Sequence, residues 1–302
     1  MTAPSPVIDP RAQSALRRLE WQLRRRSVQT LLGGAHRSVF RGRGMEFDQV
    51  VRYAYGDDIR DIDWNVTARL GDLYRKVFVE ERELTIFAVV SDDPALQFGS
   101  GAVSKREILL QLAALVMLLA VVNREAAGLL HVTPTSRILH SPTRRRARLL
   151  STLAELFAAE APDPAPPSPF QSMPLLSDPV PQGALVVWFG EIPPTPPPPE
   201  WAAFLRRHPV VGVRVEDPWE RALPEGDGFT AFDPAAGRLT WVETGSADRA
   251  AHAAWRAARE DVWRAWWPNP LDRLVVDTGA DPLSALVGFL RARRAGGARG
   301  AP

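Results

Sequence analysis

Short apolar runs alternate with helix-like segments from residue 84 to residue 294, and this alternation restricts the chain to few folds. The runs are rich in Val, Leu and Ile with few polar interruptions, as expected of parallel strands covered on both faces. Strands that alternate with helices predict a doubly wound, mostly parallel sheet with right-handed crossovers, so the fold class is α/β. The expected strands are residues 84–90, 127–132, 184–189, 210–215 and 274–277, with helices at 105–122, 144–159, 200–207 and 282–294.

Two further elements belong to this part of the chain. Residues 138–140 are expected to pair beside the second strand. A Trp-rich helix precedes the last strand, and Trp255, Trp263 and Trp266 fall on roughly one of its faces. Helical periodicity therefore predicts that these three side chains lie in the core, whereas Trp267 lies off that face and is expected at the surface.

Residues 1–83 do not continue the alternation. Leu16, Leu19 and Leu23 have the spacing of an amphipathic helix over residues 11–28, and a Gly-punctuated segment follows at 33–44. Residues 46–83 are dense in charged and aromatic side chains. We therefore predict an N-terminal arm or small subdomain over residues 1–83, packed on the sheet of an α/β domain over residues 84–302.

The composition indicates in which cellular compartment the protein is expected. The chain has no cysteine, which excludes a disulfide framework and fits a reducing compartment. Its most apolar run, residues 108–122, contains Gln111 and is shorter than the ~20 apolar residues that a membrane span requires. The first residues are polar and contain Pro, unlike a secretory signal. We expect a cytoplasmic protein with no membrane span.

A long charged and aromatic motif carries a family resemblance. It runs from Gly42 to Arg69, continues through residues 78–83, and looks similar to the bacterial domain of unknown function 58 family. The resemblance implies a von Willebrand factor A-like domain in a short form without membrane helices, and a MoxR-type AAA+ ATPase as partner. The motif residues, for which we expect a structural role, are Gly44, Glu46, Phe47, Arg52, Tyr55, Gly56, Asp57, Asp58, Arg60, Asp63, Trp64 and Arg69.

The same resemblance points to a metal position after the first strand. Von Willebrand A domains often hold Mg²⁺ or Mn²⁺ through Asp-x-Ser-x-Ser, because hard cations take carboxylate and hydroxyl oxygens. The corresponding positions here are Ser91, Asp93 and Ala95, so the leading carboxylate and the last hydroxyl are lost. Ser91, Asp92 and Asp93 remain as possible ligands. We interpret the loop as one that keeps its shape without an ion, and expect no cofactor.

Two other chemistries stay open as alternatives. Asp57, Asp58, Asp61 and Asp63 could serve a metal-dependent hydrolase, but interleaved Arg52, Arg60 and Arg69 favour a network of ion pairs, with Trp64 as a packing anchor. The Arg-rich ends could bind nucleic acid, although a solvated surface is the commoner role of such runs. These ends contain Arg17, Arg18, Arg24, Arg25, Arg26, Arg291, Arg293, Arg294 and Arg299.

Function follows from the edge loops of the predicted sheet. Ligands of doubly wound sheets bind at the carboxyl ends of the strands. We therefore predict a non-catalytic interaction module, an adaptor or scaffold that docks its ATPase partner through residues 91–101, 133–143 and 190–199. The expected contact residues are Asp92, Asp93, Thr143 and Glu191. No nucleophile motif supports an enzyme, and nucleic acid is not the expected partner.

Overall fold

The computed structural model describes residues 10–25, 45–80, 84–164, 180–233 and 236–299. The chain forms two compact units, one made of residues 1–35 and 84–302 and the other of residues 36–83. Helix α1 (Pro10–Arg25) thus groups with the residues after 83 instead of with the family motif, because Leu16, Leu19 and Leu23 are buried in the core of the first unit. The predicted packing of the motif segment on the sheet stays a prediction.

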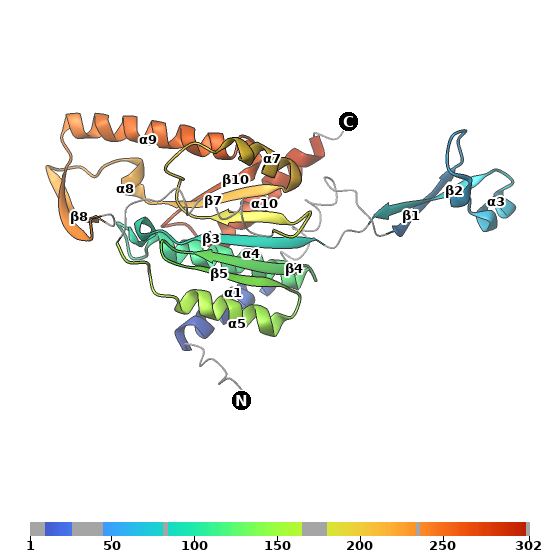
Figure 1. The fold of residues 1–302 in the computed structure, drawn as a ribbon, viewed down its shortest axis with the longest axis horizontal. Coiled ribbons are helices and arrows are strands. Elements are labelled where there is room, and N and C mark those ends of the chain that lie inside the picture. Colours follow the sequence, from blue (N-terminus) through green and yellow to red (C-terminus); the bar gives the residue numbers. More distant parts are fainter. Residues whose placement is uncertain (1–9, 26–44, 81–83, 165–179, 234–235, 300–302) are drawn as a thin grey trace. The chain divides into compact units, whose positions relative to one another are not determined.

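A six-stranded sheet forms the centre of the first unit, in the order β10-β7-β6-β3-β4-β5 (Figure 1). Every neighbouring pair is parallel except β4 and β5. The mostly parallel α/β sheet predicted from the sequence is therefore confirmed. The strands are β3 (Thr85–Ser91), β4 (Ala126–Val132), β5 (Arg137–Thr143), β6 (Leu185–Phe189), β7 (Val210–Glu216) and β10 (Arg273–Asp277).

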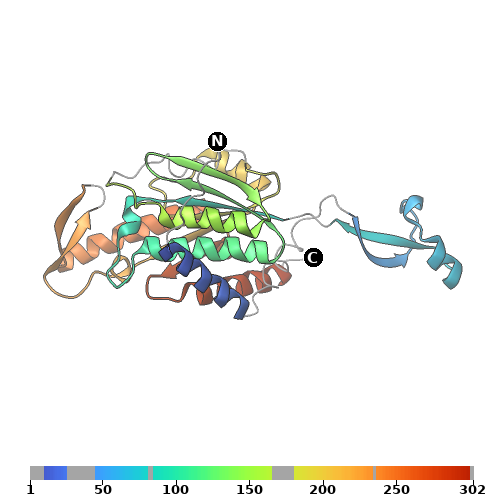
Figure 2. The ribbon, with the colours of Figure 1, turned by 90° about the horizontal axis from the view of Figure 1, so that it is seen from below.

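Helices cover both faces of this sheet, as Figures 1 and 2 show. Alternate residues of β3 divide between two cores, since Ile86, Ala88 and Val90 face one side and Phe87 and Val89 the other. Burial on both faces explains why the strand is apolar throughout. The first core also takes in α1, α4 (Lys105–Val122), α5 (Arg146–Ala158) and α10 (Pro282–Arg299), and the second takes in α7 (Pro199–Arg207) and α9 (Ser246–Trp266).

Two of the tryptophans at the Trp-rich helix α9 are not placed as predicted. Trp267 is buried, because it follows the last helical residue as the C-cap and leaves the helical periodicity. Its ring packs so closely on Gly212 of β7 that a Cβ there would lie 2.5 Å from the indole. Trp255 is instead 53% exposed, while Trp263 and Trp266 are buried as predicted. Helical spacing alone could not distinguish where along α9 the core ends.

Short elements complete the first unit at the carboxyl edge of the sheet. A 3-10 helix, η3 (Pro94–Gln97), follows β3, and α8 (Pro218–Arg221) follows β7. The predicted hairpin is present as β8 (Gly228–Asp233) and β9 (Arg238–Glu243). At the opposite, amino edge of the sheet, the 3-10 helix η5 (Pro270–Asp272) leads into β10. None of the helices in the described ranges is long and apolar enough to span a membrane.

The second unit contains most of the family motif. Strands β1 (Met45–Arg52) and β2 (Tyr74–Glu80) pair antiparallel, and the 3-10 helix η2 (Ile59–Asp61) and α3 (Trp64–Leu70) lie between them in the chain. Gly71 ends α3 in the left-handed region at φ 81°, which favours glycine. Gly44 lies outside the described residues, as do the side chains of Glu46 and Phe47.

The motif carboxylates act mainly as caps. Asp58 accepts a hydrogen bond from the Arg60 backbone N–H, and Asp63 accepts from the backbone N–H groups of Asn65 and Val66 at the start of α3. These backbone hydrogen bonds keep the pKa of Asp63 below its ordinary value, against a smaller effect of burial. Capping of this kind stabilises a helix by about 1 kcal/mol.

The predicted ion-pair partners are wrong in this unit. Asp57 pairs with Arg75 at 2.9 Å, Asp63 lies 3.7 Å from Lys76, and Arg52 pairs with Asp72. The strands bring distant residues together, so proximity in sequence misassigned the partners. Trp64 is 67% exposed, and Tyr55, Arg60 and Arg69 are also exposed. Trp64 thus does not pack within this unit, and its predicted role as an anchor stays a prediction.

Candidate functional site

The carboxyl edge of the sheet brings several predicted site residues together. The strand order runs outward from β3 in both directions, toward β4 on one side and β6 on the other, so the topological switch lies between β3 and β6. Ser91 ends β3, Asp92 and Asp93 follow it, and Glu191 follows β6. Ligands of open α/β sheets bind in the crevice at this position.

Thr143 does not join this group. Because β5 runs antiparallel to β4, Thr143 lies opposite Ala127 at the start of β4, whereas Arg137 lies opposite Val132 at the carboxyl end. Only the first part of the predicted loop 133–143 therefore reaches the functional edge. The short connection of residues 133–136 allows only antiparallel pairing, so the sequence itself indicates the end at which Thr143 lies.

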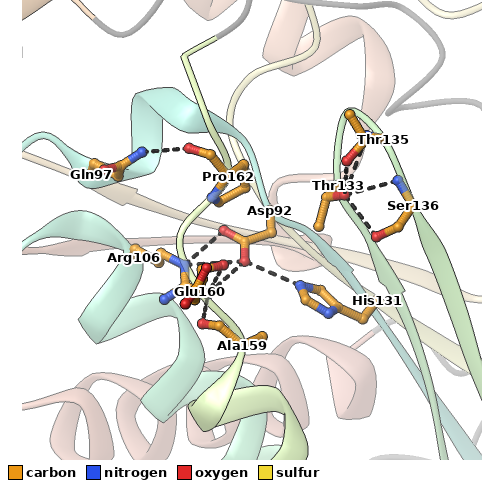
Figure 3. Close-up of polar contacts among 10 residues, drawn as sticks. All are labelled: Asp92, Gln97, Arg106, His131, Thr133, Thr135, Ser136, Ala159, Glu160 and Pro162. Atoms are coloured by element: carbon orange, nitrogen blue, oxygen red, sulfur yellow. Dashed lines mark hydrogen bonds and ion pairs between the residues drawn. The ribbon is translucent and has the colours of Figure 1, made fainter. Parts of the chain in front are cut away.

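Asp92 is held in a closed group of ion pairs on the β4 side of the edge (Figure 3). Its Oδ1 accepts from Arg106 Nε at 2.9 Å, and its Oδ2 accepts from the second guanidinium nitrogen at 2.8 Å. His131 Nε2 lies 3.1 Å from the same Oδ2. Arg106 also donates to the carbonyl oxygen of Ala159 at 2.9 Å. The carboxylate is 0% exposed, so every approach to it is occupied by protein.

Electrostatics agree with this closed geometry. Burial alone would raise the pKa of Asp92, but the hydrogen bonds and charges of His131 and Arg106 outweigh burial and lower the pKa. The group is thus an ionised carboxylate with a bidentate guanidinium partner, which is the strongest type of ion pair in proteins. Asp92 presents no surface to a partner, and we assign it to the fold of the edge.

Lys105 supplies a buried positive charge on the β6 side of the edge, opposite the Asp92 group. It is the first residue of α4, after the N-cap Ser104, and its side chain is 1% exposed. Nζ contacts an oxygen of Glu191 and lies 2.6 Å from Glu220 Oε1. Burial opposes the charge, yet the attraction of Glu191 and Glu220 outweighs it and raises the pKa of Lys105. The ammonium therefore connects α4 to the loops that follow β6 and β7.

The residues at the edge do not fit the Mg²⁺ or Mn²⁺ site implied by the resemblance. The oxygens of Asp92 are taken by Arg106 and His131, and Ala95 contributes only a backbone N–H to Asp93. Glu191 already neutralises an ammonium. In the described part of the chain, no three His, Asp or Glu side chains are grouped to share a metal ion, at this edge or around Asp57 and Asp58.

Asp93 differs from Asp92 because it lies at a cavity. A cavity of about 440 Å³ opens on the β6–β7 side of the edge, and Asp93, Glu191 and Trp255 are among its walls. Asp93 is 9% exposed; its Oδ1 accepts from the Ala95 N–H at 2.8 Å, and its Oδ2 has no hydrogen-bond partner within the described residues. Burial, with a contribution from Glu191, raises the pKa of this carboxyl. The cavity is within the size range of ligand sites.

The arginines of the cavity are bound by the protein itself. Arg259 donates to the carbonyl oxygens of Ile192 and Pro193, the latter at 2.8 Å. Arg214 lies 2.6 Å from Glu260, and Arg256 lies 3.3 Å from Glu216. These contacts fix the walls and, within the described residues, leave Asp93 and Glu191 each with one open carboxylate oxygen.

Comparison with known proteins identifies the family. The model of the family described as "Protein of unknown function DUF58" matches residues 49–262. The chain belongs to the DUF58 family. Relatives include uncharacterised proteins of Mycobacterium bovis and Mycobacterium tuberculosis, each 27% identical over 97% of this chain and 93% of the relative.

Solved structures are similar only distantly. A conserved hypothetical protein BatB from Bacteroides thetaiotaomicron is 10% identical with a TM-score of 0.36, over 70% of this chain and 99% of that one. A point mutant of the PilB minor pilin from Streptococcus sanguinis is 11% identical with a TM-score of 0.37, over 77% and 68% of the two chains. TM-scores this low carry no argument about this DUF58 chain.

Sequence reasoning missed the roles of four charged residues in this DUF58 site. The sequence pattern assigned no role to Lys105 or Arg106, although two cations that begin an otherwise apolar helix are a usable signal. Glu220 and Arg259 lie far away in sequence, and only the fold brings them to the edge.

The Arg-rich ends show no assembled site in the described residues. Arg17, Arg18, Arg291 and Arg294 are exposed, while Arg293 pairs with Asp272 at 2.7 Å. Nothing is described of Arg26, or of the side chains of Arg24, Arg25 and Arg299. The nucleic-acid alternative gains no support from this arrangement.

Proposed function

We propose that this DUF58 chain is a non-catalytic, cytoplasmic protein-interaction module that docks a partner at the carboxyl edge of a von Willebrand A-like sheet. The supporting observation is the cavity of about 440 Å³ at the topological switch, bounded by charged side chains that are fixed by internal contacts. Preformed polar walls suit recognition, since a rigid site loses little entropy when a partner binds.

Two charged groups of the edge are unsuited to acid–base catalysis. Asp92 and Lys105 are both neutralised by neighbours and shielded from solvent. A general acid or base must reach its substrate within hydrogen-bond distance, which neither group can do from its buried position. The predicted hydrolase is not supported either, because Asp58 and Asp63 are occupied as helix caps.

The partner we propose is a MoxR-type AAA+ ATPase, as the family resemblance suggests. Exposed aromatic residues commonly anchor such contacts, and Trp255 lies at the cavity with half of its surface exposed. We place the docking surface at the loops after β3 and β6 together with this part of α9. The adaptor would then present a client to the ATPase or couple the ATPase to an assembly.

Binding between purified proteins tests this proposal. The full chain is immobilised and titrated with a purified MoxR-type ATPase from the same genome, with ATP and Mg²⁺, with ADP, or without nucleotide. We expect nucleotide-dependent binding that Trp255→Ala weakens by about tenfold or more, as for an interface anchor. Trp241→Ala removes another exposed tryptophan, on β9, and is the matched control. Equal binding by both variants would reject this docking surface, and no binding in any nucleotide state would reject the partner.

A further inference from the structure

The cavity beside Asp93 contains an incomplete set of charges. Three carboxylates, Asp93, Glu191 and Glu220, surround it, and Arg259 interacts electrostatically with all three. The cations among them are Lys105 and Arg259, so three negative charges face two positive ones. This group lacks one cation.

Neighbouring charges do not supply the missing cation. Arg106 and His131 are committed to Asp92 on the other side of β3. Arg214 pairs with Glu260. Glu216 and Asp277 together are matched by Arg256, which lies 3.3 Å from Glu216, and by Arg221, which contacts both carboxylates. Each of these groups is balanced within itself, so the deficit is local to Asp93 and Glu191.

The carboxylate oxygens left free at the cavity are acceptors, although one buried donor of its wall, the Arg214 Nε–H, also has no hydrogen-bond partner within the described residues. Asp93 Oδ2 and the second carboxylate oxygen of Glu191 have no hydrogen-bond partner within the described chain, whereas Arg259 already donates to two backbone carbonyls. Asp93 is nine-tenths buried, and leaving a buried carboxylate oxygen without a donor is costly. A guest that satisfies this site must bring donors and positive charge.

The aromatic residues of the cavity wall further restrict which cationic group could bind there. Trp255 and Trp188 line the same cavity as Asp93, and Trp255 is exposed. A planar guanidinium can stack on an indole while it donates to a carboxylate, and its five N–H groups form a fixed fork. An ammonium is a compact, strongly hydrated charge without that plane.

We propose that the cavity binds an arginine side chain of the partner protein, with the guanidinium donating to Asp93 and Glu191 and stacking on Trp255. This inference rests on the proposed docking function and specifies its chemistry. In a von Willebrand A domain with a bound metal ion, the partner contributes an acidic ligand to the metal. Here the partner would instead contribute a cation to the carboxylates of the domain. A surface loop or terminus that presents one arginine would suffice.

Titration with a small arginine probe tests the inference without any partner protein. The probe is Nα-acetyl-arginine N-methylamide, and the citrulline amide of the same shape is the uncharged control. Binding is followed by NMR on the indole N–H signal of Trp255, assigned with Trp255→Phe. We expect a saturable shift at millimolar arginine amide and at least about tenfold weaker binding of the citrulline amide, because the charge-assisted contact is lost.

Variants distinguish the cavity from nonspecific attraction. Asp93→Asn keeps an oxygen for the Ala95 N–H and should weaken the arginine probe by about tenfold. Asp227→Asn removes an exposed carboxylate elsewhere in the first unit and should change nothing. Absence of a saturable shift, equal binding of lysine amide, or equal weakening by both variants would overturn the inference. Asp93-dependent Mn²⁺ binding that excludes the probe would also overturn it.

The two proposals fail separately. Binding of the ATPase through Trp255 without binding of arginine amide would leave the docking function in place and remove the arginine assignment. Binding of arginine amide without binding of the ATPase would keep the cavity chemistry and remove the MoxR-type partner.

Discussion

The two sides of the end of β3 contain adjacent carboxylates with opposite surroundings. On the β4 side, Asp92 is fully buried and has a bidentate arginine and a histidine as partners. On the β6 side, Asp93 keeps one oxygen free at a cavity and has a raised pKa. The chain thus places a structural ion pair and an open acceptor one residue apart.

This difference shows that residue type does not determine role at such an edge. Asp92 and Asp93 point to opposite sides of the switch, and the helix that follows provides Arg106 to one side and Lys105 to the other. Lys105 does not reach Asp93 because it is held by Glu191 and Glu220. The saturated side stabilises the edge, and the unsaturated side is where we propose that a partner binds.

The largest effect is expected from Arg106→Met, which removes the bidentate partner of a buried carboxylate. An uncompensated buried charge costs about 3–5 kcal/mol, so the free energy of unfolding should fall by that amount in urea denaturation at neutral pH. Arg148→Met, an exposed arginine on α5, is the control and should stay within about 0.5 kcal/mol of the wild type. Similar stabilities for the two variants would mean that Asp92 is not the closed group we describe.

A smaller loss of folding stability is expected from His131→Phe, which keeps a ring but removes the hydrogen-bond donor to Asp92. The arginine contact remains, so the cost should be about 1–3 kcal/mol, the range for a buried acceptor that loses one partner. His252→Phe on α9 provides the comparison, because no hydrogen bond or ion pair of His252 is found among the described residues. An effect of His131→Phe no larger than that of His252→Phe would remove His131 from the group.

The smallest effect, and one of opposite sign, is expected from Asp93→Asn. The pKa of Asp93 is raised in the folded state, so its ionised form opposes folding, and this penalty develops as the pH rises through the folded pKa. At neutral pH the variant should be slightly more stable than the wild type, and in acid the two should converge. Urea denaturation at several pH values measures this, with Asp227→Asn as control. A variant less stable than the wild type at neutral pH would show that Asp93 is a structural group like Asp92.

Much of the fold could be predicted from local pattern. The buried strands, the apolar helix α4 and the pairing of β5 follow from runs and periodicity, which depend on neighbouring residues. The position of Ser91, Asp92 and Asp93 at the carboxyl edge follows from the same pattern, because the loop after the first parallel strand must lie there.

The roles within the site could not be predicted, because they depend on contacts between distant residues. Lys105 meets Glu191 and Glu220 across separations of 86 and 115 residues. Burial of Trp267 depends on the chain leaving α9 and on the space above Gly212.

A paired measurement on Asp92→Asn and Asp93→Asn distinguishes the two sides of β3 in one experiment. Each variant is assayed for its free energy of unfolding and for its affinity for the MoxR-type ATPase under conditions where it is folded. We expect Asp92→Asn to lose stability and bind within about threefold of the wild type, and Asp93→Asn to keep its stability and lose about tenfold or more in affinity. If Asp92→Asn weakens binding as much as Asp93→Asn while still folded, recognition is not confined to the open side of the edge.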